Sequence, residues 1–330
     1  MRSRDLIALV ALCALLLVGM RPALAAQGDA TPAPATPQPR LPVTVTDVSG
    51  ARVTVQDISR IVPLNPDVTE IIWALGLGDR VVAVDTSASY PPEVQQLPKI
   101  GYQRQLSAEG ILSLNPTLII GTEAAGPPEV IAQLRDSGTP VVIISDPVDL
   151  QAPIVKTRAV AEALGVAEAG EQLAERIASE IASAQAAAAE AASRPRVVFL
   201  YVRGTATQMI GGAGTSADAM IVAAGGINAA AEAGIVGYKP LTAEALAAAS
   251  PDVLLLLSAG LESVGGIDGL LQIPGVAQTS AGQQQRVLAY DDLYLLGMGP
   301  RTGQALRDLV HGLHPELAPA SPVASPAAGA

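Results

Sequence analysis

Two tyrosines in this chain are each followed, two residues later, by an arginine. Tyr102 precedes Arg104, and Tyr201 precedes Arg203. On an extended segment, residues i and i+2 point to the same side, so each pair can present a phenol and a guanidinium together. A free phenol ionises at about pH 10, and a nearby positive charge or a bound metal lowers that value. Each pair can therefore supply an anionic oxygen ligand to a hard cation such as ferric iron.

The segment around Tyr102 occurs twice. Residues 101–118 read GYQRQLSAEGILSLNPTL, and residues 237–254 read GYKPLTAEALAAASPDVL. Both contain Gly-Tyr, then Leu-[Ser/Thr]-Ala-Glu, an apolar helix, a proline and an apolar strand. A repeated plan predicts two similar lobes, with a ligand site between them. Tyr238 of the second copy, with Lys239 beside it, is a third candidate for the wall of that site.

The elements that position the first motif alternate between strands and helices. The sequence VTVTDVSGARVTVQD predicts a hairpin around Ser49-Gly50. The later elements share short apolar runs bounded by turn residues: strands at RIVPL, 81–84, 118–120 and 141–144, and helices at 67–75, after Ser107 and at 128–137. Such alternation predicts a parallel sheet covered by helices, in a first lobe that spans residues 43–150.

A helix-rich region, residues 151–194, follows the first lobe. Gly165 and Gly170 are expected to weaken or break it, after which residues 171–193 can form one uninterrupted helix of about 35 Å. RVVFLYV then opens a second series, with later strands at VLLLL and VLAY, in a second lobe at 195–315. Because open α/β sheets bind ligands at the carboxyl ends of their strands, both tyrosine–arginine pairs are expected there.

The two ends of the chain carry no signal of a folded lobe. Residues 1–25 are typical of a secretory signal peptide, with a basic start, an apolar stretch and Ala23-Leu24-Ala25 as a cleavage site. Residues 26–42 form a Pro/Ala/Thr-rich linker, and residues 316–330 a similar tail that we expect to be disordered. The mature protein is therefore expected in the periplasm or at the outer side of the cell envelope.

Composition excludes several classes of function. Without the signal peptide the chain has 17 basic and 30 acidic side chains, so nucleic acid is not an expected partner. The single cysteine, Cys13, lies in the signal peptide, which leaves no disulfide and no cysteine metal site. The two histidines, His311 and His314, lie together near the C-terminal end, which argues against a zinc or manganese cage. No HExxH motif, Ser-His-Asp order or paired-carboxylate pattern suggests catalysis, so we expect no enzyme.

Several runs resemble one known family: KIGYQRQLSAEGILSLNPTLII, FLYVRGT, GTSADAMIVAAGG, GYKPLTAEALAAASPDVLLL, LESVGGIDGLLQIPGVAQT and GMGPRTGQAL. Together they resemble the haem-binding members of the rigid-helix class of substrate-binding proteins of ABC importers, over residues 43–310. The resemblance implies an α/β fold of two Rossmann-like lobes joined by one long helix. It also implies that haem binds in the cleft between the lobes and is delivered to an ABC transporter permease by a monomeric carrier.

Two other classes of function stay open beside this one. The same architecture can bind a ferric siderophore or cobalamin, although aromatic residues make up only 2% of the chain, which argues against cobalamin. An exported α/β hydrolase or sensor domain is the other alternative. An enzyme needs an activated nucleophile or a metal, and the sequence offers neither.

The resemblance also assigns roles to the tyrosine–arginine pairs. It implies an axial haem ligand at Tyr102 and, in some members, a ligand at Tyr201 with an arginine at Arg203. The candidates for the pocket wall and the haem propionates are basic or phenolic side chains: Arg104, Arg203, Tyr238 and Lys239. Other members carry a histidine in these regions and this chain has none, so tyrosine ligation is expected, with Tyr102 first and Tyr201 second. Haem iron is then the one metal expected.

Each tyrosine also has a simpler interpretation. A tyrosine at a strand end is often a half-buried packing residue, and Tyr201 and Tyr238, taken singly, fit that role better. The Gly-Tyr-x-Arg context and the family resemblance favour ligation for Tyr102. The spacing does not decide whether Tyr102 and Tyr201 bind one iron or one of them only donates a hydrogen bond. The remaining tyrosines have no adjacent arginine and are assigned to packing: Tyr90, Tyr290 and Tyr294.

Glu109 and Glu244 occupy equivalent positions in the two copies of the motif, two residues after the predicted helix N-caps Ser107 and Thr242. A carboxylate in the first helical turn stabilises the helix by a few tenths of a kcal/mol to about 1 kcal/mol. The resemblance implies a second role, because glutamates at these places dock such binding proteins on their transporters. The two roles are compatible.

Overall fold

A β-hairpin opens the described part of the chain. The computed structural model describes residues 37–318. The predicted signal peptide, residues 26–36 of the linker and residues 319–330 of the tail lie outside the described residues. β1 (Val43–Thr46) pairs antiparallel with β2 (Arg52–Val55), as the alternating sequence predicts.

Three parallel strands form the sheet of the first lobe. β3 (Ile61–Pro63), β4 (Leu118–Thr122) and β5 (Val141–Ile144) pair in that order, and their side chains are buried on both faces. The predicted strand at 81–84 is wrong as a regular strand, because Val81 and Val84 make only isolated bridges, to Ile61 and Lys99. Both valines are nevertheless buried. An apolar run signals burial, and it does not by itself specify a hydrogen-bonded partner.

Short helices follow the strands of the first lobe, and their ends match the cap residues in the sequence. They are α2 (Pro66–Ala74), η1 (Gly78–Arg80), η2 (Pro92–Gln96), α3 (Ala108–Leu112) and α4 (Pro128–Asp136). Ser107 is the N-cap of α3, and its side chain accepts a hydrogen bond from the Gly110 amide. Gly76 and Gly138 follow α2 and α4 with positive φ, as helix-ending glycines do.

Two packed helices lead from the first lobe to the second. α5 (Ala152–Ala163) ends before Gly165, whose φ is +70°, and α6 (Ala167–Ala189) has 23 residues, or about 35 Å. The prediction that Gly170 weakens or breaks the helix is wrong: it lies inside α6, which therefore begins earlier than predicted. A Cβ on Gly170 would lie 2.1 Å from Ala161 Cβ, so the glycine lets α6 pack closely on α5.

The second lobe contains a mixed sheet of six strands: β6 (Arg196–Arg203), β7 (Thr207–Gly211), β8 (Ile227–Asn228), β9 (Tyr238–Pro240), β10 (Val253–Leu257) and β11 (Val287–Tyr290). The order is β11-β10-β6-β7-β9, and β8 also pairs with β6. β6, β10 and β11 are parallel, whereas β7 is antiparallel to both β6 and β9. The three parallel strands are the ones that the sequence predicts, and they end at the same edge.

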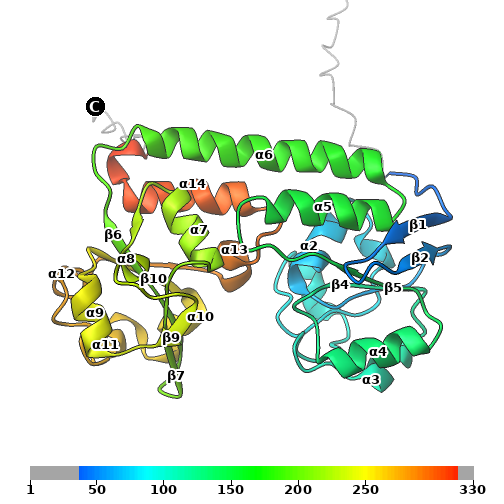
Figure 1. Cartoon of the computed structure of the whole chain (residues 1–330), viewed down its shortest axis with the longest axis horizontal. Helices are drawn as coiled ribbons and strands as arrows, with labels where there is room; N and C mark the ends of the chain where they lie inside the picture. Colours follow the sequence, from blue (N-terminus) through cyan, green and yellow to red (C-terminus); the bar gives the residue numbers. More distant parts are fainter. Residues whose placement is uncertain (1–36, 319–330) are drawn as a thin grey trace, which may run out of the picture. The chain divides into compact units, whose positions relative to one another are not determined.

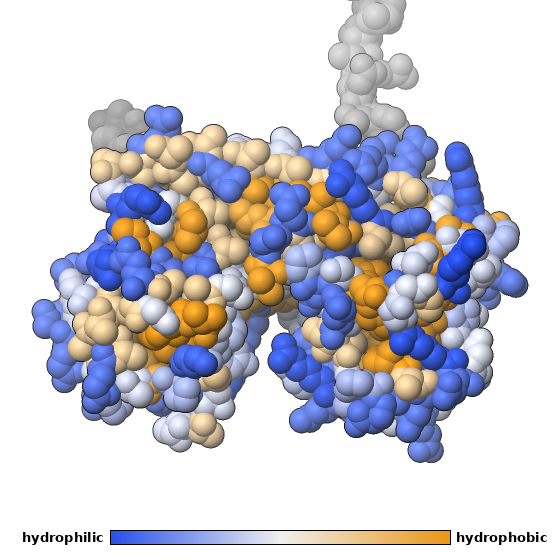
Figure 2. Space-filling view, viewed as in Figure 1, coloured by the Kyte–Doolittle hydropathy of each residue, from blue (hydrophilic) through white to orange (hydrophobic). Residues whose placement is uncertain are grey.

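Helices cover this sheet and connect it back to the first lobe. The shorter ones are α7 (Ser216–Ala223), α8 (Ala229–Glu232), α9 (Ala243–Ala249), α10 (Ser258–Ser263), α11 (Gly266–Leu270), α12 (Ser280–Gln283) and α13 (Asp292–Leu296). α14 (Thr302–Leu313) runs beside α6, which spans both lobes, and η3 (Pro315–Leu317) follows it (Figure 1). Figure 2 shows an indentation between the two lobes, below these helices, with a largely hydrophilic rim. The predicted α/β fold of two lobes joined by a long helix is thus confirmed.

Within residues 37–318, no helix combines the length and the hydropathy that a membrane crossing requires.

The two faces of β6 belong to different cores: Val198, Leu200 and Val202 face one, and Phe199 faces the other. This alternation places Phe199, Tyr201 and Arg203 on a common face.

Candidate functional site

The loop at residues 101–106 is tied to the carboxyl ends of two strands in the first lobe. Asn65, two residues after the end of β3, donates a hydrogen bond from Nδ2 to Gln103 Oε1 at 2.6 Å. The amide of Gly126, which follows β4, donates to the Gln103 carbonyl at 2.8 Å. The Leu106 amide in turn donates to the Gly126 carbonyl at 3.0 Å. The loop is therefore held at the sheet edge where a ligand is expected.

This loop presents Tyr102 to solvent. Gly101 before it has a φ of +97°, a conformation that residues with side chains rarely adopt. The Tyr102 side chain is 42% exposed, and Arg104 is exposed as well. Residues 103–105 form a turn in which the Gln105 amide donates a hydrogen bond to the Tyr102 carbonyl at 2.7 Å, so the extended geometry expected for Tyr102 and Arg104 is wrong. Both side chains are nevertheless accessible, at the edge that the sequence indicates.

Tyr201 and Arg203 lie at the carboxyl end of β6 and are both partly buried. The guanidinium does not lie beside the phenol but folds back over its ring, with Arg203 Cζ 4.6 Å from the Tyr201 ring centroid. This is a cation–π contact. The positive charge of Arg203 therefore acts directly on the Tyr201 ring.

Tyr238 joins Tyr201 on the same face of the sheet. The two ring centroids are 6.2 Å apart with an edge-to-face angle of 64°, and Tyr238 makes a similar contact with Phe199 at 6.3 Å. Gly211 lies opposite Tyr238 on β7 and opposite Phe199 on β6. A Cβ there would lie 3.0 Å from the Phe199 ring and 3.3 Å from the Tyr238 ring. The glycine thus provides the space in which the rings meet.

Charges from both lobes act on Tyr238. Partial burial raises the pKa of Tyr238 to about 12, with a further contribution from the Tyr201 phenol, and the Arg104 guanidinium opposes this shift. Arg104 belongs to the first lobe and Tyr238 to the second. Tyr201, Arg203 and Tyr238 therefore form one group of contacting side chains in the second lobe, and Arg104 of the first lobe is close enough for its charge to act on Tyr238. At neutral pH the Tyr238 phenol is protonated and can donate a hydrogen bond.

Lys239 is not brought into this group. It lies opposite Ile210 in the register of β9 with β7, one residue after Tyr238. Successive side chains of a strand point to opposite faces, so Lys239 is directed away from the tyrosine face. Tyr238 is therefore in the group, and Lys239 is not.

The two glutamates of the repeated motif are exposed in the first turns of α3 and α9. Thr242 accepts a hydrogen bond from the Ala245 amide at 3.1 Å, as the predicted N-cap. The pKa of Glu244 is lowered by a hydrogen bond from its own backbone amide and by the Thr242 hydroxyl. Glu109 and Glu244 therefore lie at matching points on the two lobes and are free to contact a partner.

Sequence reasoning missed Arg301, which connects the two lobes. Its guanidinium donates two hydrogen bonds to Glu70, and its Cζ lies 3.7 Å from the Tyr90 ring centroid and 5.1 Å from that of Tyr294. Tyr90 and Tyr294 come from different lobes, so Arg301 holds aromatic rings from both. The run GMGPRTGQAL was the available signal, but nothing in it indicates a partner in the first lobe.

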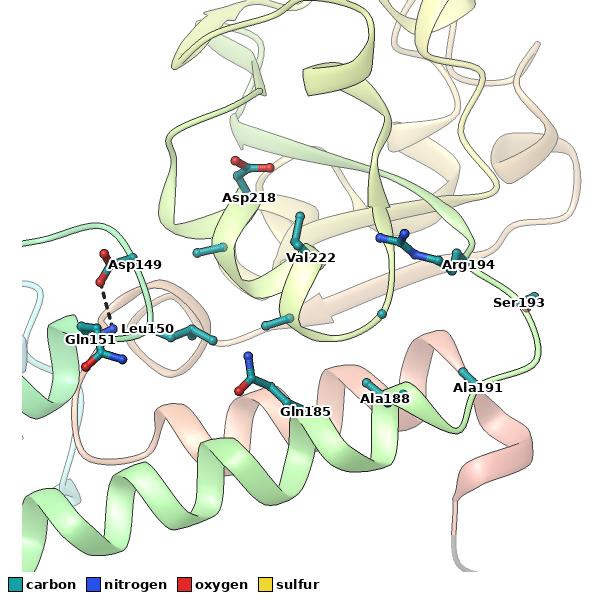
Figure 3. Close-up of a pocket in the computed structure, with 14 residues that line it drawn as sticks. Asp149, Leu150, Gln151, Gln185, Ala188, Ala191, Ser193, Arg194, Asp218 and Val222 are labelled. Carbon is teal, nitrogen blue, oxygen red and sulfur yellow. Dashed lines mark hydrogen bonds between the residues drawn. The ribbon is translucent and has the colours of Figure 1, made fainter.

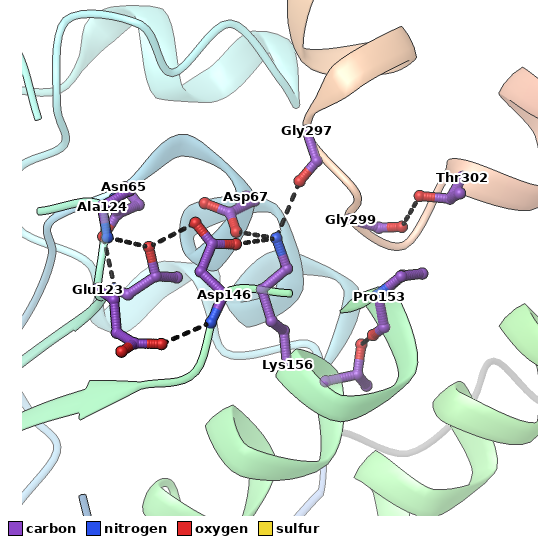
Figure 4. Close-up of polar contacts among 12 residues, drawn as sticks. Asn65, Asp67, Glu123, Ala124, Asp146, Pro153, Lys156, Gly297, Gly299 and Thr302 are labelled. Atoms are coloured by element: carbon purple, nitrogen blue, oxygen red, sulfur yellow. Dashed lines mark hydrogen bonds and ion pairs between the residues drawn. The ribbon is translucent and has the colours of Figure 1, made fainter. Parts of the chain in front are cut away.

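Lys156 forms a second connection between the lobes (Figure 4). It is only 2% exposed, and its Nζ lies 2.5 Å from Asp67 Oδ2, 3.2 Å from Asp146 Oδ1 and 3.1 Å from the Gly297 carbonyl oxygen. Burial alone would lower the pKa of Lys156, but the two carboxylates raise it above its ordinary value. The lysine is therefore a fixed cation that ties α5 and the first lobe to the segment before α14.

Two surface grooves lie away from the tyrosine group. One, of about 760 Å³, lies between α6 and α7; Figure 3 shows Gln185 pointing from α6 toward α7, with Val222 on the opposite wall. The other, of about 700 Å³, lies beside α9 and includes Ala243 and Leu246. Neither is lined by a predicted haem-site residue. The tyrosines and arginines are the better candidate site, because they bring ligand-type side chains from both lobes together.

The histidines lie far along the chain from the tyrosines. His311 is in the last turn of α14, and His314 is its C-cap, buried with Nε2 3.0 Å from the Ala224 carbonyl oxygen. Among residues 37–318 there is no group of three or more histidine, cysteine or acidic side chains arranged to hold a metal ion. Tyr102 and Tyr201 stay the predicted metal ligands.

Comparisons with known proteins agree with this architecture. A solved structure of the periplasmic heme-binding protein RhuT from Roseiflexus sp. RS-1, in its apo form, is 60% identical with a TM-score of 0.78, covering 79% of this chain and 100% of that one. An uncharacterized ABC transporter substrate-binding lipoprotein, YvrC of Bacillus subtilis, is 28% identical over 83% of this chain and 86% of its own. The cobalamin-binding protein of Halobacterium salinarum is 26% identical over 88% and 79%. Residues 61–294, more than half of the sequence, match the family described as periplasmic binding protein, and the chain belongs to that family.

Proposed function

We propose that this protein is the extracytoplasmic substrate-binding component of an ABC importer and that its cargo is haem. The observation that carries the proposal is the convergence of Arg104 from the first lobe with Tyr201, Arg203 and Tyr238 from the second. Tyr102 lies two residues before Arg104 on the same anchored loop. We propose that phenols and guanidiniums from both lobes line one cargo site.

The chemistry of this group suits ferric haem. A phenolate is a hard anionic oxygen ligand for ferric iron, and Tyr102 and Tyr201 are the proposed ligands. Arg104 and Arg203 are proposed partners for the two propionates, since guanidinium forms charge-assisted hydrogen bonds with carboxylates. Tyr238, which keeps its proton at neutral pH, is proposed as a wall and hydrogen-bond donor.

The comparisons support a carrier rather than an enzyme. RhuT is described as a periplasmic heme-binding protein, and it aligns over its whole length with this chain. YvrC is described as a substrate-binding lipoprotein of an ABC transporter. We therefore place this protein outside the cytoplasm, as a monomer behind a signal peptide at residues 1–25. Glu109 and Glu244 are its proposed contacts with the permease.

Cobalamin is a second candidate cargo, because the Halobacterium salinarum relative is described as a cobalamin-binding protein. It shares the fold class but matches at lower identity than RhuT does. Basic side chains at the proposed site would also attract an anionic ferric siderophore. Neither alternative gives a specific use to two phenols at one iron.

A haemin titration of the mature protein tests the proposal. We expect a Soret band shifted from that of free haemin, with a stoichiometric end point. Tyr102→Phe and Tyr201→Phe should each alter that spectrum and weaken binding, and the double variant should abolish the protein-bound spectrum. Tyr90→Phe is the matched control, because its ring packs on Arg301 and should leave the haem spectrum unchanged.

Cyanocobalamin and a ferric hydroxamate are titrated in parallel. Binding of either, without a Soret shift on addition of haemin, would overturn the haem proposal and leave the carrier architecture intact. A normal haem spectrum in the Tyr102→Phe, Tyr201→Phe double variant would overturn the ligand assignment alone.

A further inference from the structure

Arg203, Gly260 and Asp292 lie close together where the parallel strands of the second lobe end. β6 ends at Arg203, β10 is followed by α10 with Gly260, and β11 is followed by α13, which begins at Asp292. These strands are neighbours in the order β11-β10-β6. The sheet therefore delivers Gly260 and Asp292 to the side of Arg203.

The Arg203 guanidinium is held from several directions. Nη2 forms an ion pair with Asp292 Oδ1, and Nη1 donates a hydrogen bond to the Val202 carbonyl at 2.9 Å. The face of the guanidinium covers the Tyr201 ring. Its nitrogens are thus partly satisfied before any ligand arrives, and its orientation over the phenol is fixed.

Gly260 makes this arrangement possible. A Cβ at Gly260 would lie 2.8 Å from the Val202 carbonyl oxygen and 3.1 Å from Arg203 Nη1. The first of these neighbours is backbone, which cannot yield as a flexible side chain can. A larger residue at this position would therefore push α10 or the guanidinium away from its present place.

We propose that Asp292 is a positioning residue of the haem site: it anchors Arg203 over Tyr201 and balances the guanidinium charge that the iron-bound phenolate experiences. The inference rests on the proposed function. Asp292 and Arg203 are 40% and 33% exposed, so water screens the pair only in part. Burial raises the pKa of Asp292, and Arg203 opposes this shift. The guanidinium therefore favours the charged form of the Asp292 carboxylate.

The electrostatic consequence has a definite sign. With both residues present, the pair adds no net charge beside the phenol. Loss of the Asp292 charge leaves an uncompensated cation, which withdraws electron density from the phenolate and favours reduced iron. Loss of the Arg203 charge leaves an uncompensated anion with the opposite effect. Removing both charges restores neutrality.

The experiment measures the reduction midpoint of bound haem and the rate of haem transfer to apomyoglobin. Asp292→Asn should shift the midpoint to a more positive value and speed transfer, while Asp292→Glu should restore both toward wild type. Arg203→Ala should shift the midpoint to a more negative value, and Asp292→Asn in that background should bring it back. Gly260→Ala, which changes no charge, should speed transfer.

Asp291→Asn is the matched control, since Asp291 caps α13 through the Tyr294 amide and makes no contact with Arg203. Equal midpoint shifts in Asp291→Asn and Asp292→Asn would overturn the inference, as would a double variant whose midpoint stays at the value of Arg203→Ala. An unchanged midpoint in Asp292→Asn would do the same. If the wild-type protein binds no haem, the proposed function fails instead, and the two failures are distinct.

Discussion

Arg301 and Glu70 form a two-point ion pair although 231 residues separate them in the sequence. Nε and Nη2 of the arginine each lie 2.9 Å from one carboxylate oxygen. The side chains are only 18% and 4% exposed. Glu70 lies in α2 of the first lobe, and Arg301 lies just before α14. The pair is therefore a buried link between the lobes.

Replacement of Arg301 by Met should destabilise the protein by about 3–5 kcal/mol, because it leaves the Glu70 carboxylate buried without its partner. Equilibrium unfolding in urea measures this loss. The double variant Glu70→Gln, Arg301→Met should lose less, since no charge is left uncompensated. Arg307→Met, at an exposed position of α14, should change stability by less than about 0.5 kcal/mol. Equal losses in the single and double variants would contradict the link.

Glu70 should also give the protein a measurable pH dependence. Burial raises the pKa of Glu70 above its ordinary value of 4.5, and the hydrogen bonds and charge of Arg301 only partly offset this. The folded state then binds a proton at Glu70 more readily than the unfolded state does. Its contribution to stability is fully present below the unfolded pKa and is lost as pH rises through the folded pKa.

The difference in unfolding free energy between wild type and Glu70→Gln should therefore decrease as pH rises above the ordinary pKa of 4.5. The decrease should end once the folded-state carboxyl is ionised. Urea unfolding at a series of pH values yields this difference. A rising difference over the same interval would mean that Arg301 outweighs burial.

The sequence predicts the strands of the second lobe well for a physical reason. RVVFLYV and VLLLL are continuous apolar runs, which parallel strands buried on both faces require, and VLAY forms the half-buried edge strand β11. It predicts the 81–84 run less well, because the same apolar signal arises where a buried segment makes only isolated bridges. Gly170 misled the prediction of the long helix, since a glycine inside a helix is costly unless another helix packs against it.

The candidate site was predictable only in its local parts. Tyr102 and Tyr201 stand out because each is near an arginine and a strand end. The space that Gly211 leaves for the aromatic rings and the ion pair of Asp292 with Arg203 both depend on which strands are neighbours. The sequence does not state the strand order. Asp292 lies two residues after the VLAY strand in the sequence, but its partner Arg203 lies 89 residues earlier.

Gly211→Val should separate the aromatic rings of the site. A side chain there would meet the Phe199 and Tyr238 rings, so Tyr238 must move away from Tyr201. We expect a weaker affinity for haem and a stability loss of about 1–3 kcal/mol from overpacking. Haemin titration and urea unfolding measure the two effects.

Gly110→Ala is the control for this change, because the nearest atoms to an added Cβ lie 3.8 Å away in Ser107. It should leave the affinity for haem unchanged and stabilise α3 by up to about 1 kcal/mol. An unaltered haem affinity in Gly211→Val would show that the position of the Tyr238 ring is immaterial to the cargo.

Glu109→Gln and Glu244→Gln should separate cargo binding from delivery. Both side chains are exposed in first helical turns on separate lobes, away from the tyrosine rings, so haem affinity should not change. Transfer of haem into vesicles that contain the permease should fall in each variant and fall furthest in the double variant. Glu168→Gln, also in a first helical turn but on α6, is the control. Normal uptake by the double variant would rule out docking through these glutamates.

The lobes should move little when cargo binds. α6 spans both lobes and packs on α5 and α14, and two buried links join the lobes: Lys156 with the Gly297 carbonyl, and Arg301 with Glu70. Hinge closure would have to break these links, each of which holds a charge that has little access to water. Small-angle scattering should therefore give the same radius of gyration with and without haemin. In Arg301→Met one link is absent, so any compaction on binding should be larger than in wild type. A large compaction of the wild-type protein would mean that the buried links open during binding and cannot be what fixes the distance between Tyr102 and Tyr201.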